Sequence, residues 1–535
     1  MSAISLPTRF GAVPSRVEAR LTLAAVCLAA LCLPLGFTGA AVALHAIGQE
    51  FGAGPEALMW VNNAFMLAFG SLLLVFGTLA DRQGRRRWFL SGTALFAAAS
   101  VAAWAAPGIV ALDLLRALQG VGAAAILSSG PAALAQVFDE PARPRAYSLL
   151  GASFGVGLAF GPLLAGALVH GVGWRSFFLV LAALTAGAGL LGAYAMRESR
   201  NPAAAAQRVD WLGASSFTLG LALFTWAVLR APERGWADAS VLALLVVAAG
   251  LLLFFVRTEL RVAHPMLDLR LFRSARFAGV QWLAVAPAWS FVVLLVLLPL
   301  RFIGAEGWPE VQVGWWMLAL SGPMLVVPLL SGWLVRWVSA GVLSGVGLLG
   351  CAAGLAWLAQ WMPGDAPAAL LPPLLLIGCG IGLPWGLMDG LAVSVVPREQ
   401  AGMAAGIFNT LRVAGEGIAV ALVGTLLAAL VQAQLPHGAT ASAAHQAAAG
   451  DLVQAAALLP GVPAPVLHAA YAQAFQSLLY LLAGISVVSA LVAFRALRRP
   501  SVSRAAKTGT ASAPASAGCQ TALQASRPRA RGPGA

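Results

Sequence analysis

Three acidic residues lie inside long apolar stretches of this chain: Asp113, Asp389 and Glu416. Arg116 and Arg412 stand three or four residues from two of these acids. A charged side chain at the centre of a bilayer costs roughly 2.5–3.5 kcal/mol on insertion scales. Five such groups within apolar segments therefore indicate a functional role, and the chemistry that suits them is the movement of ions or protons across a membrane.

Composition indicates that lipid surrounds the elements that hold these residues. The chain has 535 residues, of which 60% are hydrophobic and 10% charged, whereas soluble domains carry about 25% charged residues. Apolar runs of about 20 residues recur, and a run of that length crosses a bilayer as a helix. A transmembrane barrel would show short segments of alternating polarity. We therefore expect an all-α polytopic membrane protein.

The apolar runs predict fourteen transmembrane helices. An even number of spans places both termini on the same side of the membrane. The expected spans are 21–45, 57–80, 88–106, 109–137, 146–170, 174–196, 210–230, 239–257, 277–300, 312–334, 341–361, 369–396, 402–432 and 472–494.

The positive residues predict the orientation of these spans. Loops on the cytoplasmic side carry an excess of Lys and Arg. With a cytoplasmic N-terminus, 27 of the 33 Lys and Arg residues fall on the inner side and 4 on the outer side, Arg301 among them. Both termini are thus expected in the cytoplasm, with the chain in the inner (plasma) membrane of a bacterial cell. The net charge of +13 is spread over short clusters between spans, so no nucleic-acid partner is expected.

Two segments outside the spans are long. The loop 433–471 is Ala-rich and expected on the outer side, where His437, His445 and His468 would be solvated; no metal or cofactor is expected. The segment 495–535 is rich in Ser, Ala, Pro, Gly and Arg, a composition that cannot bury a core. It is predicted to be a disordered, basic, cytoplasmic tail.

The turn between the second and third spans carries a charged motif, Gly77-Thr-Leu-Ala-Asp81-Arg82-Gln-Gly84-Arg85-Arg86-Arg87. Its glycines permit a tight turn, and Asp81 can accept charge-assisted hydrogen bonds from the arginines. This stretch resembles the GxLaDrxGrrr signature of the major facilitator superfamily. The residues that we expect to form a cytoplasmic gating loop are Gly77, Asp81, Arg82, Gly84, Arg85 and Arg86.

Further motifs support this resemblance over about residues 20–495. The fourth span is similar to the second motif of the superfamily, and the fifth to its third motif, which is associated with antiporters. The stretches 264–272 and 396–399 resemble, more narrowly, the fourteen-helix drug:proton antiporter family. The matching residues are Leu112, Arg116, Gln119, Gly120 and Gly122 in the fourth span, and Gly157, Gly161, Pro162 and Gly166 in the fifth.

The resemblance implies two six-helix halves, 21–196 and 277–494, with two inserted helices and a linker in 197–276 between them and a cytoplasmic N-terminus at 1–20. It also implies that Asp81 latches the outward-facing arrangement against the start of the thirteenth helix, 401–406. The alternative is that the turn only anchors topology. Glycines at the positions of the third motif, with Pro162, indicate a rocking interface between the halves, and the resemblance assigns them a role in suppressing leak.

The intramembrane charges leave alternatives open. Asp113 lies on the same helix face as Arg116, and the pair is either a proton-uptake device or a static ion pair. Glu416 is either a proton carrier or a neutralising partner for Arg412, and we favour the partner.

The candidate substrate cavity contains Trp385 and Gln119. Asp389 shares a helix face with Trp385, and an acid beside an aromatic ring suits an organic cation; the alternative is a position near the inner water interface. The stretch 35–45 lacks the acid that the first helix of the family often carries. Coupling is therefore not expected to depend on that helix.

These features predict a proton-coupled secondary active exporter, an antiporter of amphipathic organic compounds or drugs that works by alternating access. One alternative is a dedicated exporter of a single metabolite, such as a siderophore or an amino-acid derivative. Another is a membrane enzyme or sensor, for which the sequence offers no HExxH, GxSxG or paired His–Asp cluster, so no enzyme is expected. The expected partners are a small organic substrate, protons and the lipid bilayer, with a periplasmic adaptor as a further candidate.

Overall fold

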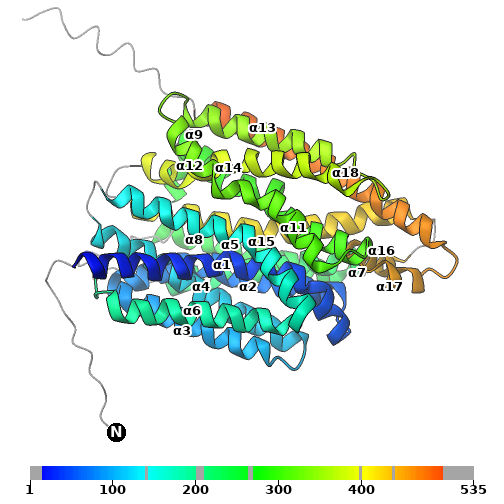
Figure 1. Ribbon diagram of the computed structural model, residues 1–535, viewed down its shortest axis with the longest axis horizontal. Coiled ribbons are helices and arrows are strands. Elements are labelled where there is room, and N and C mark those ends of the chain that lie inside the picture. Colours follow the sequence, from blue (N-terminus) through cyan, green and yellow to red (C-terminus); the bar gives the residue numbers. More distant parts are fainter. Residues whose placement is uncertain are drawn as a thin grey trace, which may run out of the picture. The chain divides into compact units, whose positions relative to one another are not determined.

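Long helices make up the computed structural model of this chain (Figure 1). The structure describes residues 15–138, 142–200, 210–262, 269–396, 401–435 and 440–497. No β-strand occurs among them, because a helix satisfies its own backbone where lipid offers no hydrogen-bond partner. Thirteen of the described helices are long and apolar enough to cross a membrane. The prediction of an all-α polytopic membrane protein is confirmed.

The fourteen expected spans all appear as helices, and most are longer than the apolar runs that predicted them. Polar residues begin several of them: Ser15 forms a capping box with Glu18, and Asp210 and Asp238 cap the inserted pair. The helices of this part of the chain are α1 (Arg16–Phe51), α2 (Pro55–Gln83), α3 (Arg85–Trp104), α4 (Ile109–Val137), α5 (Arg143–Val172), α6 (Arg175–Ala195), α7 (Trp211–Arg234) and α8 (Ala239–Arg261). Of these, α3 begins with three arginines and is the expected span outside the thirteen.

Several spans in the second half of the chain are interrupted. Two π-helical turns begin directly after Pro287 and Pro299, since proline has no N–H to continue the regular ladder. The elements are η2 (Leu269–Arg273); α9 (Ala275–Pro287), η3 (Ala288–Val292), α10 (Val293–Pro299) and η4 (Leu300–Ala305) in one span; α11 (Glu310–Ser321), η5 (Gly322–Leu325) and α12 (Val327–Leu334) in the next; then α13 (Ala340–Leu358), η6 (Pro367–Leu370), α14 (Leu371–Ser394), α15 (Ala401–Gln434) and α18 (Ala464–Ala496).

The helices pack as two bundles with the inserted pair beside them. In the first bundle, α2 and α3 pack on α4, and α1 packs on α5 and α6; in the second, α13 packs on α14 and α18. Helix α7 contacts α2 of the first bundle and α15 of the second, whereas α8 packs mainly on α7. Small residues permit the close approaches: a Cβ built on Gly92 would lie 2.9 Å from the carbonyl oxygen of Gly122.

The two bundles meet along two seams. In one, α2 packs on α15, and a Cβ on Gly70 would lie 2.6 Å from the backbone nitrogen of Ala414. In the other, α5 packs on α11 and η5. The site described below lies between these seams.

Two sequence predictions about the expected outer segments need correction. The ninth expected span does not end at residue 300: the helix continues to Ala305, and Arg301 is 2% exposed within η4, with its Nε 3.7 Å from Glu306. The loop 433–471 is not solvated throughout, because α16 (Ala441–Ala448) and α17 (Leu452–Ala457) fold within it and bury His445. His468 is exposed, as expected, and His437 lies outside the described residues.

The contacts within the chain divide it into two units, Met1–Arg498 and Arg499–Ala535. Most of the predicted disordered tail lies outside the described residues, as do most of the 264–272 stretch and nearly all of the 396–399 stretch.

Candidate functional site

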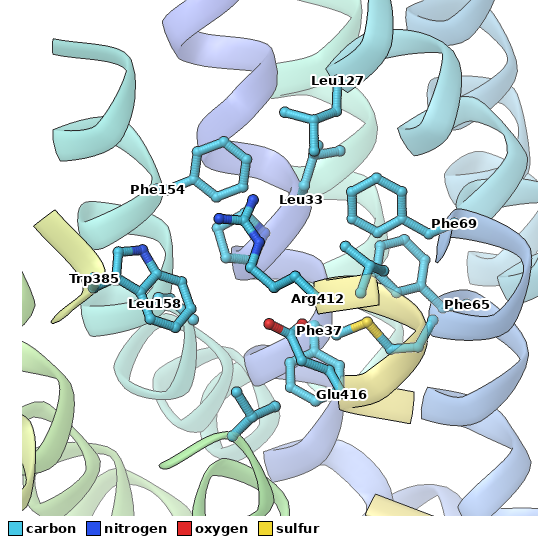
Figure 2. A pocket seen from close by; sticks show the side chains of 14 residues that line it. Leu33, Phe37, Phe65, Phe69, Leu127, Phe154, Leu158, Trp385, Arg412 and Glu416 are labelled. Carbon is cyan, nitrogen blue, oxygen red and sulfur yellow. The ribbon is translucent and has the colours of Figure 1, made fainter. Parts of the chain in front are cut away.

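A pocket lies between the two bundles and is lined by both (Figure 2). Its walls are largely aromatic and aliphatic, and two charged residues reach it, both from α15. Its volume is about 40 Å³, room for a few water molecules. The residues that line it are Leu33, Pro34, Phe37, Phe65, Met66, Phe69, Leu127, Phe154, Leu158, Val292, Trp385, Arg412, Val413 and Glu416.

Arg412 is held by polar and aromatic neighbours. One terminal nitrogen donates to Asp389 Oδ1 at 3.4 Å and the other to Asn409 Oδ1 at 2.7 Å. The guanidinium carbon lies 5.7 Å from the ring centroid of Trp385 and 5.7 Å from that of Phe408, within cation–π distance. Arg412 thus presents a neutralised and well-positioned cation to the pocket.

Glu416 interacts with the charge of Arg412 but forms no ion pair with it among the described residues. The ion pair of Arg412 is with Asp389, and among the described residues Glu416 forms no ion pair or hydrogen bond. The Glu416 carboxylate points into the pocket, near Phe37 (Figure 2). Whether Glu416 serves as a proton carrier or as a neutralising partner of Arg412 therefore stays a prediction. The arrangement leaves an acid, 8% exposed, within apolar and aromatic walls.

Of the two residues predicted for the substrate cavity, only one lines this pocket. Trp385 lines the pocket, as predicted. Gln119 does not: it is fully buried, accepts a hydrogen bond from Arg116 at 2.7 Å and donates to Ser100 Oγ at 2.6 Å. Gln119 is thus part of the support for Arg116 and lies away from the cavity.

Arg116 is the most buried charge of the first bundle. Its Nε donates to the carbonyl oxygen of Val61 at 2.9 Å, and its guanidinium carbon lies 4.5 Å from the Phe65 ring centroid. Asp113 shares its helix face but forms no ion pair with it in the described part of the chain. The two charges interact without forming an ion pair, and Val61 of α2 and Gln119 of α4 accept the hydrogen bonds of Arg116.

The motif turn between α2 and α3 is held within its own bundle. Arg85 forms an ion pair with Asp81 at 2.7 Å and donates to the carbonyl oxygen of Ala132 on α4. Arg86 donates to the carbonyl oxygen of Ala193 on α6. Gly84 adopts φ 125°, a conformation that favours glycine, so it permits the turn as expected.

Sequence reasoning missed Glu198 in this region. Its two carboxylate oxygens accept from the backbone N–H groups of Arg86 and Arg87, each at 3.2 Å. These N–H groups lie in the first turn of α3, where they have no acceptor within the helix. The helix dipole also favours a negative charge at this end. A single acid after a predicted helix end gives little signal, because its target is more than a hundred residues earlier in the chain.

The glycine motif of α5 serves two different contacts. Cβ atoms built on Gly157 and Gly161 would meet α1 of the same bundle, at Pro34 and Thr38. A Cβ on Gly166 would lie 2.5 Å from the carbonyl oxygen of Glu310 on α11, in the other bundle. Gly155, which the motif does not include, faces Met324 of η5. The prediction of an interface between the bundles therefore fails for Gly157 and Gly161 and suits Gly166, while the carbonyl oxygen of Pro162 faces Gly314.

Two helical bundles with a pocket and charged side chains between them have the architecture of a multi-pass membrane transporter. The chain belongs to the Major Facilitator Superfamily, whose family model matches residues 26–420.

Curated relatives agree with this assignment. The chain is 33% identical over 399 residues to the multidrug resistance protein Stp of Mycobacterium tuberculosis, covering 74% of each chain. It is 29% identical over 494 residues to the tetracenomycin C resistance and export protein of Streptomyces glaucescens, covering 88% of this chain and 90% of the relative. A crystal structure of a bacterial homologue of the lysosomal transporter Spinster has a similar fold, with a TM-score of 0.62 and 16% identity, over 90% of this chain and 97% of that one.

Proposed function

We propose that this protein exports amphipathic organic compounds across the plasma membrane by alternating access, and that proton entry drives the export. The observation that carries this proposal is the Glu416 carboxylate inside an aromatic pocket between the two bundles, with no hydrogen bond or ion pair among the described residues. The names of relatives as multidrug resistance and export proteins support the substrate class.

The chemistry of the pocket explains the coupling. A carboxylate in apolar surroundings is costly, and either a proton or a cationic substrate removes that cost. Because the ion pair of Arg412 is with Asp389, the Glu416 carboxylate can exchange a proton for a cationic substrate. Neutralisation of Glu416 would then bias the equilibrium between the two arrangements of the bundles.

The orientation belongs to the same proposal. The excess of Arg in the segments on the side of the α2–α3 turn supports cytoplasmic termini. Asp81 is engaged by Arg85 in this structure, so we assign its latch against the start of α15 to a different, outward-facing state.

Transport in proteoliposomes tests the proposal. Purified protein would be reconstituted with an imposed pH gradient, and ethidium, an aromatic organic cation, would be followed by fluorescence. The wild type should move ethidium against its gradient, and a protonophore should stop the movement. Glu416→Gln should abolish the response to the gradient, whereas Asp365→Asn, an exposed carboxylate in a loop, should transport normally. Unchanged proton-driven transport by Glu416→Gln would reject the role of Glu416.

A second candidate is export of a single metabolite. It is favoured by the relative that is named for resistance to and export of one compound, tetracenomycin C. Competition by a panel of unrelated amphipathic cations separates the two functions, because a dedicated exporter would leave most of them untransported.

A further inference from the structure

One stretch of α2 lies between the two buried charge systems. On one side, Val61 accepts a hydrogen bond from Arg116, and the Phe65 ring lies against the same guanidinium. On the other side, Phe65 and Met66 line the pocket with Glu416. A Cβ built on Gly417, the residue after Glu416, would lie 3.1 Å from Met66 Cβ and 3.9 Å from Asn63 Oδ1. Residues 61–66 therefore bridge α4 and α15.

Two asparagines in this stretch bury polar atoms without partners. Asn62 and Asn63 are each 1% exposed. Neither amide atom of Asn62 has a hydrogen-bond partner among the described residues, and Asn63 donates to the carbonyl oxygen of Met59 but leaves its Oδ1 unused. On α4, which packs against α2, Arg116 Nη2 and one carboxylate oxygen of Asp113 are also buried without a hydrogen-bond partner.

Such groups need a ligand that both donates and accepts. A buried amide left without hydrogen bonds costs about 1–3 kcal/mol, and native proteins usually satisfy it with protein groups or ordered water. Water suits a mixed set of donors and acceptors and is small enough to fit between packed helices. Asparagine does not titrate, so its role here is to hold water in place and not to carry the proton itself.

We propose that Asn62 and Asn63 hold a chain of bound water that links the Asp113–Arg116 region of α4 to Glu416, and that protons reach Glu416 along it. This inference rests on the proposed function. A proton leaves the carboxyl group of Asp113, the water molecules relay it, and a new O–H bond forms on the Glu416 carboxylate. Arg116 keeps its charge throughout and orients the water, and Arg412 borders the far end of the path.

Separate measurements of coupling and of substrate movement test the link. The variants are Asn62→Leu, Asn63→Leu and the double variant, which keep the branched side-chain shape but remove the amides. The matched control is Ser71→Ala on the same helix, whose hydroxyl is buried but already bonded to the carbonyl oxygen of Leu67. Each protein is assayed in proteoliposomes for ethidium transport driven by a pH gradient, and for ethidium–ethidium exchange without a gradient.

If bound water links Asp113 to Glu416, gradient-driven transport by the double variant should fall at least about tenfold. Ethidium–ethidium exchange should stay within about twofold of the wild type. Ser71→Ala should match the wild type in both assays. Equal loss of both activities, or no loss of either, overturns the link. If the double variant is not monodisperse in detergent, the two single variants decide by the same criterion.

Failure of the proposed function has a different signature. A wild type that exchanges ethidium but ignores the pH gradient would reject proton coupling itself, and the link with it. A wild type that responds to the gradient, beside leucine variants that respond equally, would reject the link alone.

Discussion

Arg412 on α15 donates to Asp389 on α14 at 3.4 Å, so its ion pair is with a neighbouring helix and not with Glu416 on its own helix. The two partners come from different helices of the same bundle. The Asp389 side chain is 64% exposed, whereas that of Arg412 is 9% exposed. The pair therefore joins the buried pocket to a more accessible surface of α14.

Removal of Asp389 should disable the pocket with little loss of stability. In Asp389→Asn the Arg412 guanidinium keeps its hydrogen bond to Asn409 but loses its ion-pair partner. Arg412 then competes with protons and substrate for the Glu416 carboxylate. Because Asp389 is largely exposed, the loss of unfolding free energy should stay near about 1 kcal/mol. Transport of ethidium should fall strongly. The double variant Asp389→Asn with Arg412→Gln should recover part of it; a double variant worse than both single ones would contradict this pairing.

Replacement of Arg116 should act on both fold and transport. Arg116→Ala leaves Gln119 Oε1 without its donor within the bundle, at a cost of about 1–3 kcal/mol for a buried acceptor left unpaired. Thermal unfolding in detergent should shift downward. Arg116→Lys should recover stability only in part, because one ammonium group cannot reproduce two fixed donors and the stacking on Phe65. Full transport and full stability in Arg116→Ala would contradict this assignment.

Glu198 should stabilise the motif turn through the start of α3. Glu198→Ala removes the acceptor of two backbone N–H groups, and we expect a loss of about 1 kcal/mol, similar to the loss of a helix cap. Hydrogen exchange should rise at the amides of Arg86 and Arg87 and remain unchanged at the start of α6. Glu18→Ala, which removes an ion pair with Arg197 at the beginning of α1, is the comparison. Unaltered exchange at Arg86 would reject the capping role.

The α5 glycines should divide into two classes by phenotype. Gly161→Ala meets Thr38 within the first bundle and should lower its stability, as seen by thermal unfolding. Gly166→Ala meets backbone of α11 across the seam and should instead impair transport by separating the bundles there. Crosslinking of cysteines placed at Leu163 and Val313 in a cysteine-free background would report the seam. Similar crosslinking in wild type and Gly166→Ala would contradict this division.

Local pattern was sufficient for much of the fold. The helices at the fourteen expected positions, the turn at Gly84 and the charged residues of α15 were all visible in the sequence, because apolar run length, glycine conformation and residue type are local properties. The helix ends were less accurate, as at Ala464, where α18 begins eight residues before the expected span. The span that holds Arg301 ends later than expected, because its apolar run stops before the helix does.

The sequence by itself determined that the chain is a helical membrane protein with acids and arginines held in its apolar spans, since hydropathy and length settle that question one segment at a time. Only the tertiary structure decided which of these groups meet. Whether Arg412 pairs with Asp389 or Glu416, whether Gln119 faces the cavity or Arg116, and whether an α5 glycine touches α1 or α11 depend on the rotation of each helix about its axis. That rotation is set by packing against neighbours that are distant in the chain, and no local pattern contains it.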